Sequence, residues 1–167
     1  LVELVEVNSE DYAKELEKSE LPEADLYYLE LCGANSSASV YVNGRKLASH
    51  DGGYSTWRVN ITDALKAKNL IVIEVDNSVN DTVYPQHADF TFYGGLYRNV
   101  NILAVSSSHF DLDYFGGPGI QVTPEVTGTS ANVNIEVFVT NRTDAQQIRY
   151  TIKDAEGNVV AGTTCAD

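Results

Sequence analysis

The feature that most constrains the fold of this chain is an Asn-Gly pair between two alternating segments. Residues 39–42 (SVYV) and 45–48 (RKLA) flank Asn43-Gly44. A two-residue type I′ turn needs positive φ at both central positions, which Asn and Gly adopt more readily than other residues. The stretch therefore predicts a β-hairpin, with Asn43 and Gly44 as structural residues.

The same period of two recurs along the first hundred residues. Residues 27–31 alternate in character, and Ile71, Ile73 and Val75 share one face of a strand expected at 70–75. Further strands are expected at 56–61, which carries the single tryptophan, Trp57, as a core residue, and at 96–105. We expect a loop at 50–53 and one helical turn at 62–65, with Thr62 or Asp63 as its N-cap.

Two regions of the chain differ from this pattern. Residues 10–20 (EDYAKELEKSE) have helical composition but no long apolar stripe, so a strand and a short helix both stay open. After residue 106, a turn-rich bend at 115–119 precedes four short expected strands, at 120–126, 131–140, 147–153 and 158–164. Their regular spacing is typical of an immunoglobulin-like sandwich, which needs about seven strands and about 100 residues. We therefore expect a complete β-sandwich over 1–106 and the N-terminal part of a second, truncated one over 107–167.

Charge and composition exclude several classes of protein. The 167 residues include 24 acidic and 11 basic side chains, for a net charge of −13. Nucleic-acid binders concentrate Lys and Arg, so no nucleic-acid partner is expected. No apolar run approaches the ~18 residues of a membrane span, and no signal peptide is recognised. We expect a soluble chain and assign no compartment.

The sequence has few groups suited to catalysis or metal binding. It lacks a G-x-S-x-G elbow, a phosphate-binding glycine loop and an H-E-x-x-H pair. Residues 76–81 offer oxygen ligands without EF-hand spacing, so turn-forming Asx residues are favoured over a metal site. The two cysteines form neither a disulfide framework nor a zinc site, and Cys32 is expected in the core. We predict no metal and no cofactor.

The stretch DFTFYGGLYRNV, residues 89–100, combines four aromatic rings, a carboxylate, a guanidinium and a double glycine. A plain strand does not need this chemistry. The double glycine suits a sharp bend or a close backbone approach. The stretch is therefore either a bent core strand or the edge of a ligand site.

Five short motifs in order resemble the N-terminal sugar-binding domain of glycoside hydrolase family 2, which includes β-galactosidases, β-glucuronidases and β-mannosidases. They are Val42-Asn43-Gly44, Gly52-Gly53-Tyr54, Asn60-Ile61-Thr62, Val75-Asp76-Asn77, and the run Asp89, Gly94-Gly95, Arg98, Asn99-Val100. Asn60 and Asn99 stand where the family often has Asp, but both keep a short polar side chain. The similarity spans most of residues 27–106.

This resemblance implies a jelly-roll, galactose-binding-like β-sandwich followed by an immunoglobulin-like one. It also implies that the two catalytic glutamates lie in a TIM barrel absent here, so that the chain alone is inactive. Asp89 would bind substrate, with His87, Phe90 and Tyr93 as neighbours. Arg98 would form a structural ion pair or contact the barrel, and Gly94 and Gly95 would be structural. The implied partners are a β-linked glycoside, with a galactoside favoured, and the barrel of the same polypeptide.

Three functions stay open at this point. The chain is an accessory region of a family 2 β-glycosidase, a stand-alone carbohydrate-binding module, or a fragment of tandem β-sandwiches with an adhesive or scaffolding role. The apparent truncation within the second region favours the first. It also predicts self-association, because an incomplete sandwich leaves strand edges and apolar side chains open.

Overall fold

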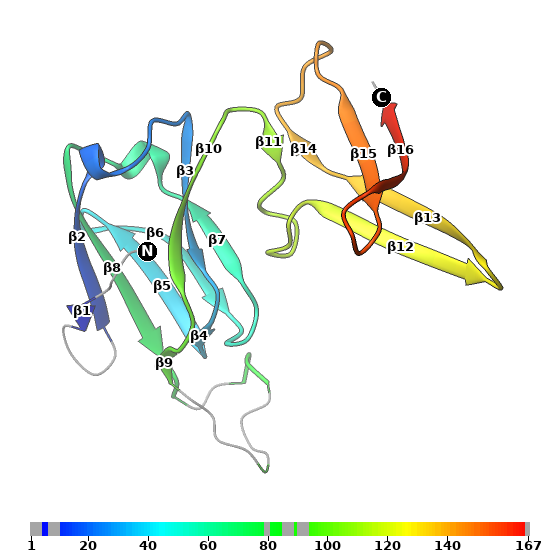
Figure 1. Cartoon of the computed structure of the whole chain (residues 1–167). Helices are drawn as coiled ribbons and strands as arrows, with labels where there is room; N and C mark the ends of the chain where they lie inside the picture. The colour runs from blue at the N-terminus through cyan, green and yellow to red at the C-terminus, as the bar shows by residue number, and fades with distance from the viewer. Residues whose placement is uncertain (1–4, 7–10, 79–80, 85–88, 90–93, 166–167) are drawn as a thin grey trace.

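The computed structural model describes residues 5–6, 11–78, 81–84, 89 and 94–165, almost all of them in strands and turns (Figure 1). The strands of the first part are β1 (Val5–Glu6), β2 (Asp11–Glu17), β3 (Leu26–Leu31), β4 (Ala34–Asn35), β5 (Ser37–Val42), β6 (Arg45–Asp51), β7 (Trp57–Asn60), β8 (Lys68–Asp76), β9 (Gly95–Leu96) and β10 (Val100–Val105). The second part contains β11 (His109–Phe110), β12 (Ile120–Thr127), β13 (Ser130–Val137), β14 (Val139–Thr140), β15 (Ile148–Lys153) and β16 (Val159–Cys165). Two 3₁₀ turns cover Lys18–Glu20 and Thr62–Ala64. No helix among these residues is long and apolar enough to cross a membrane.

The Asn-Gly hairpin forms as predicted. Asn43 has φ of 54° and Gly44 has φ of 80°, and β5 pairs with β6 on either side of them. The Asn43 amide also donates to the Ala64 carbonyl at 2.9 Å, and its oxygen accepts the Leu70 backbone N–H at 3.1 Å. Asn43 therefore ties the hairpin turn to the strand β8 beside it, which is a structural role.

The first part is a sandwich of two sheets, in the strand orders β1-β2-β8-β5-β6 and β10-β3-β7. Every second residue of the central strands points inward, as the alternation predicts. The buried apolar residues form one cluster between the sheets: Leu29, Leu31, Val40, Val42, Trp57, Val59, Ile71, Ile73, Val75 and Val100 among them. The expected all-β sandwich is confirmed, and Trp57 is part of its core.

Tertiary pairing corrected two local predictions and decided a third that the sequence left open. His50 and Asp51 are not in a loop, since they pair with Ala38 and Ser37 at the end of β6. The expected strand at 96–105 is broken, because Tyr97 to Asn99 leave the sheet between β9 and β10. Residues 11–17, left open between helix and strand, form β2 and pair with β8.

Two polar positions also differ from expectation. Neither Thr62 nor Asp63 caps the 3₁₀ turn. The turn begins after Ile61, and the Asn60 side chain accepts the Thr62 backbone N–H at 3.0 Å. Cys32 is half-buried and not a full core residue, because its thiol faces the Glu30 carboxylate at 3.6 Å.

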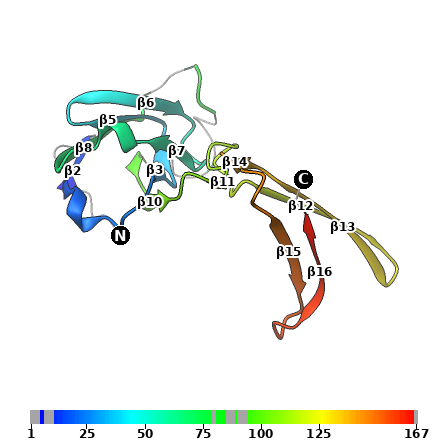
Figure 2. The ribbon, with the colours of Figure 1, turned by 90° about the horizontal axis from the view of Figure 1, so that it is seen from above.

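The second part consists of separate antiparallel pairs, β11-β14, β12-β13 and β15-β16. Seen from above, the two long hairpins extend away from the sandwich (Figure 2). Most side chains of β12 and β16 are exposed. The immunoglobulin-like assignment and the boundary at residue 106 stay predictions.

Candidate functional site

One end of the sandwich collects several turns of the first part. Asp51 and Asp76 both pair with Ser37, so the ends of β6 and β8 meet at the start of β5. In the other sheet, Leu31 pairs with both Trp57 and Val100, so the turns that adjoin these strands also lie at this end. We call this the loop end; it comprises the described residues of 32–36, 52–56, 77–84, 89 and 94–99 (Figure 1).

Asp89 is exposed and belongs to the segment between β8 and β9, whose two ends lie at the loop end. Its predicted neighbours His87, Phe90 and Tyr93 lie outside the described residues. The role of Asp89 in sugar binding therefore stays a prediction. An exposed carboxylate can hydrogen-bond hydroxyl groups, which are the main polar groups of a sugar.

Gly94 and Gly95 allow close packing at the loop end. Gly95 has φ of 76°, and a Cβ atom there would collide with the Tyr12 hydroxyl. A Cβ atom on Gly94 would collide with the amide of Asn77. The Tyr12 hydroxyl in turn accepts the Leu96 backbone N–H at 3.3 Å. The double glycine thus lets this turn approach β2 and the end of β8.

Tyr97 and Arg98 connect two turns of the loop end to each other. The Tyr97 hydroxyl donates to the Gly53 carbonyl, and the rings of Tyr97 and Tyr54 meet edge to face at 6.3 Å. The Arg98 guanidinium donates to the Tyr54 carbonyl at 3.1 Å and approaches the Cys32 carbonyl at 3.4 Å. Among the described residues Arg98 forms these contacts with backbone carbonyls and no ion pair, and its expected contact with the barrel stays a prediction.

His50 and Trp57 form a stacked pair beside this network. Their ring centroids are 5.2 Å apart, and the His50 ring also lies 3.1 Å from the Ser55 hydroxyl. Burial lowers the pKa of His50, and the negative charge of Asp51 opposes that shift. The Trp57 indole N–H is buried without a hydrogen-bond partner among the described residues.

The other predicted structural residues are not part of this site. Asn43 and Gly44 lie at the opposite end of β5 from Ser37.

Asp76 accepts the Ser78 backbone N–H at 2.8 Å, which is the Asx turn favoured at this position. That hydrogen bond lowers the pKa of Asp76. Among the described residues, no three His, Cys, Asp or Glu side chains gather closely enough to hold a metal ion.

A buried charged cluster supports the sheet behind the loop end. Arg58 and Glu30 form an ion pair at 2.7 Å, and Asn101 donates to the other carboxylate oxygen at 3.0 Å. Burial alone would raise the pKa of Glu30, but the hydrogen bonds from Asn101 and Arg58 and the Arg58 charge hold it below its usual value. Burial, together with the Glu30 charge, raises the pKa of the Cys32 thiol. A carboxylate held in this way is structural.

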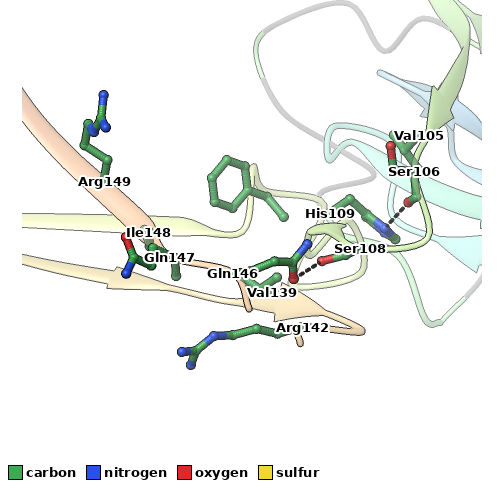
Figure 3. Close-up of a pocket in the computed structure, with 11 residues that line it drawn as sticks. Val105, Ser106, Ser108, His109, Val139, Arg142, Gln146, Gln147, Ile148 and Arg149 are labelled. Atoms are coloured by element: carbon green, nitrogen blue, oxygen red, sulfur yellow. Dashed lines mark hydrogen bonds between the residues drawn. The ribbon is translucent and has the colours of Figure 1, made fainter. Parts of the chain in front are cut away.

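Sequence reasoning missed a hollow that lies between the end of β10 and the second part of the chain (Figure 3). It is lined by Phe110, Val139 and Ile148, with Arg142 and Arg149 beside them. Its residues are dispersed over three segments with no motif in common. No signal in the sequence brings these segments together.

Comparison with known proteins decides the family. Residues 2–110 match the domain family described as glycosyl hydrolase 2 galactose-binding domain-like. The chain belongs to glycoside hydrolase family 2. The resemblance that the loop-end motifs indicated is therefore confirmed.

The relatives of this family 2 chain are named as glycosidases. It is 34% identical over 119 residues to a β-glucuronidase of Bacteroides fragilis, a match that covers 69% of this chain and 17% of the relative. It is 31% identical over 109 residues to a β-galactosidase of Thermoanaerobacter pseudethanolicus, covering 62% of this chain and 15% of the relative. The family 2 chain thus spans less than a fifth of the length of either protein.

Solved structures give the same family. An FMN-binding β-glucuronidase from Faecalibacterium prausnitzii L2-6 superimposes with a TM-score of 0.85 at 43% identity, over 92% of this chain and 24% of that one. A β-glucuronidase of Bacteroides uniformis superimposes with a TM-score of 0.81 at 30% identity, over 93% of this chain and 19% of that one. Both comparisons extend beyond the sandwich into the second part of the family 2 chain.

Proposed function

We propose that this chain is the N-terminal sugar-binding region of a retaining β-glycosidase, and that the enzyme is a β-glucuronidase. The family match over residues 2–110 carries the first half of the proposal. The second half is supported by the names of similar proteins, which include β-glucuronidases at 43% and 34% identity. The galactoside favoured from the sequence becomes the second candidate, supported by the T. pseudethanolicus β-galactosidase at 31% identity.

The contribution of this region is binding and not bond cleavage. A retaining glycosidase needs two carboxyl groups about 5–5.5 Å apart across the scissile bond. In this proposal a separate catalytic barrel supplies them, and Asp89 helps to hold the non-reducing sugar at its mouth. The contacts of Tyr97 and Arg98 with the turn at 52–54 would keep the loop end rigid, which lowers the entropy lost when a ligand binds.

The test uses the full-length parent enzyme and this chain side by side. The parent should hydrolyse 4-nitrophenyl β-D-glucuronide with a higher kcat/KM than 4-nitrophenyl β-D-galactoside. The purified 167-residue chain should hydrolyse neither. A reversed preference would replace the glucuronidase with the galactosidase. A parent inactive on both, or hydrolysis by the chain alone, would reject an accessory region of either enzyme.

A further inference from the structure

The cavity between the sandwich and the second part of the chain has an unusual charge for this protein. Two of the three basic residues that follow position 106, Arg142 and Arg149, line it, although the chain as a whole carries a charge of −13. No Asp or Glu is among the described residues that line it. In Figure 3 the two arginine side chains lie on either side of Ile148 and Gln147. The cavity therefore concentrates positive charge within an acidic molecule.

Neither arginine has a partner among the residues that the structure describes. The ion pairs between described residues use Arg58 and Lys68, and Arg58 and Arg98 also donate to backbone carbonyls. Arg142 and Arg149 form no hydrogen bond or ion pair with another described residue. A guanidinium presents five N–H donors in a planar fork that matches a carboxylate or a phosphate. No described side chain or backbone carbonyl occupies these donors, which can therefore meet a ligand.

The remaining lining provides an apolar surface and one oriented amide. Phe110 is 49% exposed, and Val139 and Ile148 are half-buried beside it. The Gln146 side-chain oxygen accepts from the Ser108 hydroxyl at 2.8 Å and from the Thr143 backbone N–H at 3.0 Å. These two bonds fix the Gln146 amide and leave its nitrogen as a donor. Exposed apolar side chains next to arginine side chains suit a ligand that has an apolar ring and an anionic group.

One acidic group close to Arg142 is already engaged. Asp111 lines an adjoining hollow together with Arg142. Its carboxylate accepts the backbone N–H groups of Asp113 at 2.9 Å and Tyr114 at 2.7 Å, and the Thr140 hydroxyl at 3.0 Å. Asp111 therefore stabilises the loop at 111–114 instead of pairing with Arg142.

We propose that this cavity binds aromatic anions. The ring packs on Phe110, Val139 and Ile148, while a carboxylate or phosphate on the ring meets Arg142 or Arg149. The volume of about 480 Å³ lies within the range of small-molecule sites. The cavity adjoins Val105 at one end of β10, and the loop end adjoins Val100 at the other. Six strand residues, about 17–20 Å, separate the two, so this site does not depend on the proposed sugar site.

Binding should be measured by NMR titration of the ¹⁵N-labelled 167-residue chain with three probes. Phenylacetate and phenyl phosphate distinguish a carboxylate from a phosphate, and phenylacetamide keeps the ring without the charge. We expect saturable shifts at Phe110, Val139 and Ile148 with at least one anion, with a Kd on the order of 1 mM. Raising the salt concentration should weaken binding, because exposed charge pairs are screened.

Variants show where the anion binds. Arg142→Gln together with Arg149→Gln should weaken binding at least about tenfold, as the loss of a charge-assisted hydrogen bond does. Arg45→Gln is the matched control, because Arg45 is an exposed arginine in the β5-β6 hairpin, remote from the cavity. It should leave the affinity unchanged. If the double variant does not fold, the salt dependence and the phenylacetamide comparison on the unaltered chain still test the proposal.

Several outcomes would overturn the proposal. They are no shift with either anion at about 20 mM, equal affinity for phenylacetamide, or equal affinity in the double variant. The NMR shifts of the cavity residues should also be measured without a probe at several chain concentrations. If they change with chain concentration, a second copy of the chain occupies the cavity, and a small-molecule site is rejected.

Discussion

The Arg58 Nε atom lies 2.7 Å from the Glu30 Oε2 atom, and both side chains are largely buried. The same guanidinium donates to the carbonyl oxygens of Leu112, at 2.9 Å, and Gly117, at 2.8 Å. Arg58 belongs to β7 of the sandwich, whereas Leu112 and Gly117 belong to the loop between β11 and β12 in the second part. One side chain therefore joins the ion pair inside the sandwich to the first loop of the second part.

Removal of the Glu30 charge should destabilise the sandwich strongly. In Glu30→Gln the Arg58 charge stays buried without its counter-ion, which costs about 3 kcal/mol. Trp57, the single tryptophan, reports unfolding in guanidinium chloride by fluorescence. Lys68→Gln is the control, because it breaks an exposed pair with Glu17 and should cost less than about 1 kcal/mol. Equal costs for the two variants would contradict the structural role of Glu30.

The contribution of Glu30 should also depend on pH. Its pKa lies below the usual 4.5 in the folded chain, because Asn101 and Arg58 stabilise the carboxylate. The stabilisation is fully present above pH 4.5, where both folded and unfolded chains are ionised. It decreases as pH falls below 4.5 and is lost below the folded pKa. The difference in unfolding free energy between the unaltered chain and Glu30→Gln should therefore shrink in acid; a difference independent of pH would argue against this origin.

Arg58→Lys should loosen the connection between the two parts even though it keeps the charge. A lysine ammonium cannot donate in a fixed fork to Glu30, Leu112 and Gly117 at once. We expect faster limited proteolysis in the segment 106–119, compared with the unaltered chain at the same fraction folded. An unchanged cleavage rate in that segment would show that other contacts hold the connection.

Gly95→Ala should cost more than Gly44→Ala. Both glycines have positive φ, which costs an alanine about 1 kcal/mol. A Cβ atom at Gly44 meets open space, whereas at Gly95 it collides with the Tyr12 hydroxyl, which adds about 1–3 kcal/mol of overpacking. Adding Tyr12→Phe to Gly95→Ala should recover part of this excess in denaturation experiments. No recovery would show that the collision is not the cause.

Asp89→Ala should affect the enzyme and not the fold. A lost turn cap would cost this chain about 0.5–2 kcal/mol, whereas an exposed ligand contact should cost almost nothing. In the full-length parent, the loss of a charged hydrogen bond to sugar should lower kcat/KM at least about tenfold. Asp63→Ala, an exposed acid at the opposite end of the sandwich, is the control. A less stable chain beside a fully active parent would assign Asp89 to the fold.

The second part should cause the isolated chain to self-associate. Val122, Val126, Val159 and Val160 are more than half exposed on the two long hairpins, whose edges can pair with another chain. The net charge of −13 opposes association, so added salt should promote it by screening. Sedimentation velocity should show a concentration-dependent species larger than a monomer. A monomer at all concentrations and in high salt would reject this prediction.

The sequence by itself determined the class of fold and the family. Alternation along 27–31 and 70–75 places Leu29, Leu31, Ile71 and Ile73 in the core, because successive side chains of a strand point to opposite faces. The Asn43-Gly44 turn was equally predictable, since few other residues accept positive φ at both positions. The ordered motifs around Asn43, Gly53, Asp76 and Gly95 identified family 2 without any structure.

Only the tertiary structure decided where strands end and which polar groups meet. His50 and Asp51 join β6 because β5 provides backbone hydrogen-bond partners there. Residues 97–99 leave the sheet because Tyr97 and Arg98 hydrogen-bond to the carbonyls of the turn at 53–54 instead. Arg58, Glu30 and Leu112 are 28 and 54 positions apart in the chain, so no local pattern predicts their contact. No local pattern predicts the cavity at Arg142 and Arg149 either. Hydrogen bonds and charge clusters between distant segments depend on how the sheets pack and not on sequence periodicity.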